Sequence, residues 1–130
     1  MEQVNYKHSE LTQRVIGLAM KVHSKIGLGF PEKVYQRALA IELRKAGIKF
    51  VMEKAQDVFY DNEWVGTRRV DFIVESILLV EIKAISEMAS KEYNQIQNYL
   101  EAFNMEVGLL INFGCSSLKF NRFVNKLFQQ

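Results

Sequence analysis

Cysteine is almost absent from this chain, since Cys115 is the single one among 130 residues. One cysteine excludes an internal disulfide framework and fits a reducing cytoplasm. No apolar run approaches the ~18 residues that a transmembrane helix needs. The first ten residues, MEQVNYKHSE, also lack the basic-then-apolar pattern of a secretion signal. We therefore expect a cytoplasmic protein without a membrane-spanning segment.

Excess charge of either sign is also scarce, because the net charge is only +2 and the sequence pI is about 8.7. So slight a basic excess permits a nucleic-acid partner but does not argue for one. The length and the composition, 48% hydrophobic and 25% charged, are typical of a single globular domain. We expect residues 1–130 to form that one domain.

Two helices are predicted in the first third of the chain. Ser9 resembles an N-cap, and the apolar residues after it recur at helical spacing, which predicts an amphipathic helix over 10–26. The glycines of the following GLGF stretch end that helix. Pro31 suits the first position of a second helix and Gly47 suits its end, so we expect this helix over 31–46.

Strands are predicted from residue 49 onward, because the apolar spacing there changes from 3.6 to 2. The predicted elements are strands 49–60, 64–74 and 78–84, a helix over 88–103 and a strand over 106–113. YDNE and ESI are the turns between the first three strands. The tail suits either a short edge strand or a final helix. The order ααβββαβ(β) indicates an α/β fold with one mixed β-sheet flanked by helices.

Three charged residues interrupt the most apolar part of the predicted sheet, RRVDFIVESILLVEIKA. Charge in a dry interior is costly unless it is paired or bound. Matching apolar positions pairs Phe72 with Val80, and that register places Asp71 opposite Glu81. Because side chains alternate along a strand, Lys83 shares a face with Glu81. The sequence therefore predicts two carboxylates and an ammonium group in one patch.

Two adjacent carboxylates repel each other unless one is protonated or a cation lies between them. Mg²⁺ is the obvious cation, because carboxylates, waters and phosphate oxygens are the ligands that it takes. Such an ion neutralises charge on a reacting phosphoryl group, and Lys83 would stabilise the transition state or place the attacking water. The alternative is the solvated face of an ordinary strand, since acid-x-lysine pairs arise readily by chance in a chain with 15 acidic residues.

Motifs on both sides of this patch resemble a known superfamily. VDF, followed after seven residues by VEIKA, resembles the Asp…Glu-x-Lys core of the PD-(D/E)xK nucleases. Gly29-x-x-Glu32-x-x-Tyr35 matches the signature of the GxxExxY family of small proteins in that superfamily. Gln95-x-x-x-Tyr99 resembles the Gln-xxx-Tyr motif of its RecB-like and lambda-exonuclease-like branch.

The resemblance spans about residues 8–124 and implies a restriction-endonuclease-like fold, in agreement with the order of elements. It also implies a metal site for Mg²⁺ or Mn²⁺ and a catalytic lysine. The implied metal ligands are Asp71, Glu81 and, from the second helix, Glu32, with the Ile82 carbonyl as an extra ligand. Lys83 is the implied catalytic lysine.

On the substrate side, the resemblance implies that Gln95 and Tyr99 position a phosphate or the metal-site residues from one face of a helix. Arg69 shares the predicted face of Asp71, and it suits either a bidentate grip on a phosphate or a salt bridge to a neighbouring acid. Val70 stands where many superfamily members have proline, a residue that shapes the strand end and does no chemistry.

The expected function is therefore Mg²⁺- or Mn²⁺-dependent hydrolysis of phosphodiester bonds in DNA. The alternative is a non-catalytic module that binds nucleic acid or a protein, and a purely structural charge cluster is a third hypothesis. The lack of a second recognition domain favours the alternative, although a homodimer would supply a larger surface. Only the nuclease requires a metal at Asp71 and Glu81 together with metal-dependent turnover.

Overall fold

The structure, a computed structural model, describes residues 8–130. Its elements are α1 (Ser9–Ile26), α2 (Glu32–Lys45), β1 (Phe50–Tyr60), β2 (Glu63–Val74), β3 (Leu78–Lys83), α3 (Ser90–Ala102), β4 (Val107–Asn112) and β5 (Lys119–Val124). This order confirms the predicted ααβββαβ(β) pattern. It also decides between the two alternatives for the tail, which forms an edge strand and not a helix.

The five strands form one mixed sheet in the order β1-β2-β3-β4-β5. Strands β3 and β4 are parallel, and every other neighbouring pair is antiparallel. Phe72 pairs with Val80, which confirms the register predicted from apolar matching. Strands β3 and β4 lie inside the sheet with helices on both faces, so their residues are buried in nearly every position.

Both N-terminal helices differ slightly from their predicted starts. His8, in a left-handed conformation with φ 57°, is the N-cap of α1, so Ser9 is the first helical residue and the predicted Ser9 cap is wrong. Pro31 is the N-cap of α2, with φ −71°, and the helix begins one residue later. The fixed φ of proline suits either position, and sequence alone does not separate the two.

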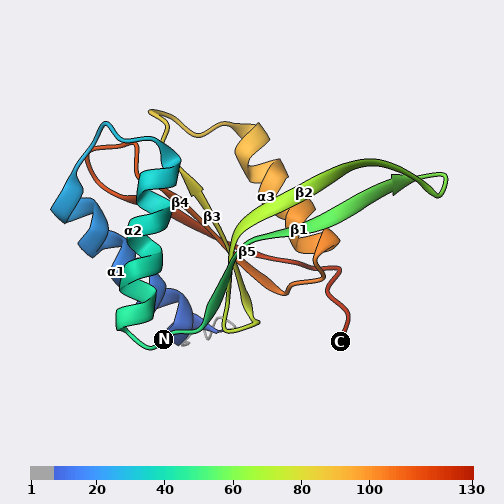
Figure 1. Cartoon of the computed structure of the whole chain (residues 1–130), viewed down its shortest axis with the longest axis horizontal. Coiled ribbons are helices and arrows are strands. Elements are labelled where there is room, and N and C mark those ends of the chain that lie inside the picture. Colours follow the sequence, from blue (N-terminus) through green and yellow to red (C-terminus); the bar gives the residue numbers. More distant parts are fainter. Residues whose placement is uncertain (1–7) are drawn as a thin grey trace, which may run out of the picture.

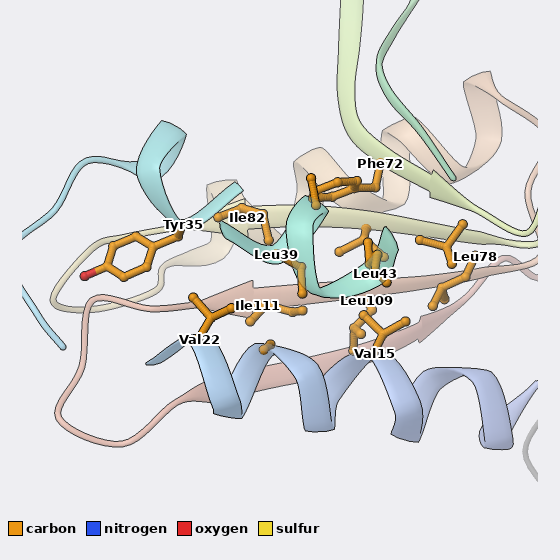
Figure 2. Close-up of a cluster of buried hydrophobic side chains, with 14 of the residues drawn as sticks. Val15, Val22, Tyr35, Leu39, Leu43, Phe72, Leu78, Ile82, Leu109 and Ile111 are labelled. Atoms are coloured by element: carbon orange, nitrogen blue, oxygen red, sulfur yellow. The ribbon is translucent and has the colours of Figure 1, made fainter. Parts of the chain in front are cut away.

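Helices α1 and α2 lie side by side on one face of the sheet, and α3 covers the opposite face (Figure 1). Tyr35, Leu39 and Leu43 form one buried stripe on α2, because residues four apart share a helix face. Figure 2 shows this stripe packed with side chains of α1 and of the central strands, among them Val15, Phe72, Leu78, Leu109 and Ile111. The central strands β3 and β4 are therefore shielded from water on both faces, where an unpaired charge would be costly.

Strands β1 and β2 continue beyond the body of the protein as a two-stranded arm (Figure 1). Asp61 and Asn62 form its tip with φ values of 49° and 65°, which confirms the predicted YDNE turn. Side chains near the tip are exposed, with Tyr60 at 71% and Trp64 at 61%. At the opposite end, the arm enters the sheet at Asp71, so its root borders the predicted site.

Candidate active site

Strands β2 and β3 separate at the predicted carboxylates. Their regular pairing ends at Phe72 and Val80. At the next position, Asp71 Oδ2 accepts a hydrogen bond of 2.7 Å from the Ile82 N–H, and Glu81 Oε1 accepts one of 2.8 Å from the Asp71 N–H. Each carboxylate thus binds the backbone of the opposite strand where the ladder stops. These bonds confirm that Asp71 and Glu81 lie together, and they hold both side chains in place.

The normal alternation of side chains is broken at Asp71. Val70 and Phe72 are two residues apart, so a regular strand would direct both toward the same face. In the structure, Phe72 belongs to the core under α1 and α2, whereas Val70 packs on the α3 side with Ile73. The Asp71 carboxylate consequently lies in the gap between β2 and β3, where both flanking helices approach it.

Burial and mutual repulsion govern the protonation of the two acids. Glu81 is only 5% exposed, and burial, followed by the nearby charge of Asp71, raises its pKa to about 8. Burial also raises the pKa of Asp71, with a further contribution from Glu32, while the Ile82 N–H and Lys83 act in the opposite direction. The pair therefore favours a proton or a cation over two free negative charges.

A hydrogen-bonded chain links the predicted lysine to α3. Lys83 Nζ donates to Gln95 Oε1 at 2.8 Å, and Gln95 Nε2 donates to the Tyr99 hydroxyl at 3.2 Å. Burial, and then the charge of Glu81, raises the pKa of the Tyr99 hydroxyl. The structure thus joins Lys83, Gln95 and Tyr99 by hydrogen bonds, and their roles in the site stay predictions.

Glu32 reaches the edge of this site because the preceding loop is held tightly. Gly27 and Gly29 have φ values of 70° and 100°, which favour glycine. The Tyr35 hydroxyl donates to the Gly27 carbonyl at 2.6 Å, and its ring stacks on Phe113 at 4.7 Å. Gly29, Glu32 and Tyr35 therefore act together. Tyr35 holds the turn in place, and the turn places Glu32 at the start of α2, where its side chain is exposed.

The oxygen donors suit a hard divalent ion. Asp71 and Glu81 supply two carboxylates whose pKa values are raised by burial first and by neighbouring negative charge second. In a strand the N–H and C=O of one residue point to the same side, so the Ile82 carbonyl faces the gap that holds Asp71. Two carboxylates with a carbonyl and waters match what Mg²⁺ takes from proteins.

Glu32 does not lie close enough to Asp71 and Glu81 to form a three-acid cluster with them. Within residues 8–130, no three Asp, Glu, His or Cys side chains are placed closely enough to hold a metal by themselves. Glu32 affects the site through its charge, which raises the pKa of both Asp71 and Glu81. Its role as a metal ligand therefore stays a prediction.

Two supporting residues escaped the sequence analysis. Gln36 is 2% exposed, and its side-chain amide donates to Asp71 Oδ1 at 3.2 Å. Asn112 accepts hydrogen bonds from the backbone of Ile85 and Gly114 and donates to the Ile85 carbonyl, so it fixes the chain just after β3. Asn112 is a polar residue at the end of an otherwise apolar strand, and this pattern could have identified it from the sequence. For Gln36 the sequence offered only its spacing of four residues from Glu32.

Arg69 lies at the root of the arm, exposed to solvent. Its guanidinium group donates to the backbone carbonyl of Glu53 at 3.4 Å. This contact leaves the predicted phosphate grip of Arg69 untested.

The fold and the site together define a class of protein, a small α/β domain with an Asp…Glu-x-Lys cluster where two sheet strands separate. The family model of the PD-(D/E)XK nuclease superfamily matches residues 9–123, and the chain belongs to this superfamily. No curated protein matches the chain significantly. No helix in residues 8–130 is both long and apolar enough to cross a membrane.

Two solved structures are similar to this chain over 94% of its length. The crystal structure of SSO0001 has 17% sequence identity and a TM-score of 0.58, and the match covers 58% of that chain. An alkaline exonuclease from Laribacter hongkongensis, LHK-Exo, has 9% identity and a TM-score of 0.46, with 73% of that chain covered. The chain thus spans little more than half of SSO0001, and that likeness concerns the fold alone.

Proposed function

We propose that the protein is a Mg²⁺- or Mn²⁺-dependent nuclease that hydrolyses phosphodiester bonds in DNA. The single observation that carries this proposal is the pair of carboxylates, half-buried Asp71 and buried Glu81, held at the strand separation with Lys83 beside them. Membership of a nuclease superfamily supports the same chemistry. Within the superfamily, we assign the chain to the GxxExxY family on the motif formed by Gly29, Glu32 and Tyr35. We assign it to the RecB-like and lambda-exonuclease-like branch on Gln95 and Tyr99.

In this proposal, Asp71, Glu81 and the Ile82 carbonyl hold the metal, and Glu32 completes the negative environment around it. A bound divalent ion polarises the phosphoryl oxygen and lowers the pKa of a coordinated water. The protein's own contribution is orientation: the Asp71 and Glu81 carboxylates are already fixed by backbone N–H groups. Gln36 restrains Asp71 further.

Lys83 is the group that acts on the reacting atoms. Its ammonium has three donors, and Gln95 takes one of them at 2.8 Å, which leaves the others for the attacking water or a phosphate oxygen. Positive charge at that place stabilises the negative charge that develops in the transition state. Gln95 and Tyr99 position the lysine, and Arg69 grips a neighbouring phosphate.

One observation favours the second candidate, a binding module without catalysis. Both carboxylates accept backbone hydrogen bonds across the gap between β2 and β3, so each also has a structural role in joining the two strands. Such a module would bind nucleic acid equally well in EDTA. The predicted homodimer bears on this candidate, because two copies would double the contact surface, and sedimentation of the purified protein tests it.

Cleavage assays separate the two candidates. Labelled single-stranded, duplex and branched DNA, and RNA, are incubated with the protein in Mg²⁺, in Mn²⁺ and in EDTA. We expect cleavage of at least one DNA substrate with metal and none in EDTA. An Asp71→Asn variant, which keeps the size of the side chain but removes its charge and one of its two acceptor oxygens, should lose both metal binding and cleavage. Binding that is independent of metal, without cleavage of any substrate, would instead support the binding module.

A further inference from the structure

Three cations gather around one acid at the root of the arm, beside the site. Glu53 of β1 lies opposite Asp71, between two regular pairs of β1 and β2. Its Oε2 is 2.9 Å from Lys33 Nζ on α2, and its backbone carbonyl accepts from Arg69 at 3.4 Å. Arg37 is four residues after Lys33 and shares its helix face. Lys33 above all, followed by Arg69 and Arg37, lowers the pKa of the Glu53 carboxyl group.

The ion pair between Glu53 and Lys33 can separate at little cost in free energy. The two side chains are 41% and 48% exposed, and ion pairs in water contribute little to stability. Glu53 also has a left-handed φ of 52°, which is unfavourable for a residue with a side chain. Separating this ion pair therefore requires no unfolding and buries no unpaired charge.

The site needs cations at this place if it is to accept a polyanion. Glu32, Asp71 and Glu81 concentrate negative charge where a nucleic-acid strand would lie, and like charges repel. Lys33 counteracts this, since its charge lowers the pKa of Asp71. A phosphodiester and a carboxylate each carry one negative charge, so one can replace the other beside Lys33 without a change in net charge.

We propose that Lys33, Arg37 and Arg69 form a binding site for a backbone phosphate of the nucleic-acid substrate, and that the Glu53 carboxylate occupies this site until the phosphate displaces it. The inference rests on the proposed function, because it places the substrate strand along the root of the arm next to the metal site. Glu53 is accordingly an internal competitor that weakens substrate binding.

Binding in EDTA tests this proposal without any need for turnover. Fluorescence anisotropy is measured with a labelled 12-nucleotide single-stranded DNA and with a short labelled DNA duplex. Glu53→Gln keeps the shape of the side chain and removes the competing charge, and we expect it to tighten binding about two- to fivefold, the range that exposed ion pairs allow. Glu63→Gln, which removes an exposed acid near the tip of the arm, is the matched control for net charge.

The double variant identifies the freed cation. In a Lys33→Gln background, Glu53→Gln should have no larger effect than Glu63→Gln. Lys33→Gln alone should weaken binding and reduce the slope of log K against log salt by about 0.7 to 0.9. The proposal is overturned if Glu53→Gln binds no more tightly than Glu63→Gln, if its effect is undiminished without Lys33, or if no variant binds either DNA.

These outcomes are independent of the cleavage result. Wild-type protein that cleaves DNA with Mg²⁺, together with a Glu53→Gln variant that binds no more tightly than the control, would reject the phosphate site and keep the nuclease. Tighter binding by Glu53→Gln in a protein that cleaves nothing would keep the phosphate site and reject the nuclease.

Discussion

Glu81 is a carboxyl group with 5% exposure that faces a second carboxyl group across a strand gap. In the unfolded chain it would ionise near its ordinary pKa of 4.5, whereas in the folded protein its pKa is about 8. Between these values the folded state holds a proton that the unfolded state has released. Because the unfolded state binds fewer protons there, the stability of the metal-free protein falls as pH rises through this window.

Glu81→Gln should remove most of that dependence on pH. The side-chain oxygen of glutamine still accepts from the Asp71 N–H, but the group does not ionise. In EDTA near pH 5 the variant and the wild type should have similar free energies of unfolding. Above pH 8 the variant should be more stable by about 2–4 kcal/mol, measured by urea unfolding across the pH range. Parallel pH profiles for the two proteins would contradict the assignment of the raised pKa to Glu81.

At the scale of elements, two local structures position the site. One is the separation of β2 and β3 at Asp71, beyond the Phe72–Val80 pair, and the other is the glycine loop before α2. The first holds Asp71 and Glu81 by backbone hydrogen bonds. The second depends on Tyr35, whose buried hydroxyl donates to the Gly27 carbonyl. The strand separation determines where Asp71 and Glu81 lie, and the glycine loop determines where Glu32 lies.

Tyr35→Phe should weaken the loop while sparing the core. The ring still stacks on Phe113, but the hydroxyl's bond to the Gly27 carbonyl and the weaker bond that it accepts from the Phe30 N–H are lost, which costs about 1–2 kcal/mol in the free energy of unfolding. DNA cleavage should also fall, because Glu32 is less well placed. Tyr60→Phe, at an exposed position near the tip of the arm, is the control and should change neither quantity. Equal losses in both variants would argue against the loop's role.

The elements themselves were largely predictable, because they follow from local apolar spacing and a register that apolar matching could fix. Pairing Phe72 with Val80 sufficed to bring Asp71 opposite Glu81. The strand separation was not predictable, since alternation assigns Val70 and Phe72 to one face and the structure places them on two. Gln36 was missed for a similar reason: its burial against Asp71 depends on how α2 packs, and spacing alone does not give that.

At the scale of the whole molecule, a packed body carries the site and the arm extends from it (Figure 1). The body is layered, with α1 and α2 on one face and α3 on the other, and all proposed metal and catalytic groups lie where β2, β3, α2 and α3 meet. The outer part of the arm has exposed side chains, Phe59 at 60% and Trp64 at 61%. Its tip therefore contributes little to the stability of the body.

Shortening the arm tests this division. Replacing residues 58–66 with a two-residue Asn-Gly turn keeps the Asp57–Thr67 pair and closes the hairpin there. Thermal unfolding should show a change of less than about 1 kcal/mol in stability, because the deleted side chains are mostly solvent-exposed. A loss of several kcal/mol would show that the outer arm supports the body after all.

The most direct test of the nuclease is the cleavage rate of a Lys83→Ala variant in Mg²⁺. Wild type, Lys83→Ala and Lys91→Ala, whose lysine side chain is 86% exposed on α3, are purified identically and assayed on the DNA that the wild type cleaves. We predict that Lys83→Ala folds normally but cleaves at least about 100-fold more slowly, whereas Lys91→Ala matches the wild type. Full activity of Lys83→Ala would contradict a catalytic site at Asp71, Glu81 and Lys83.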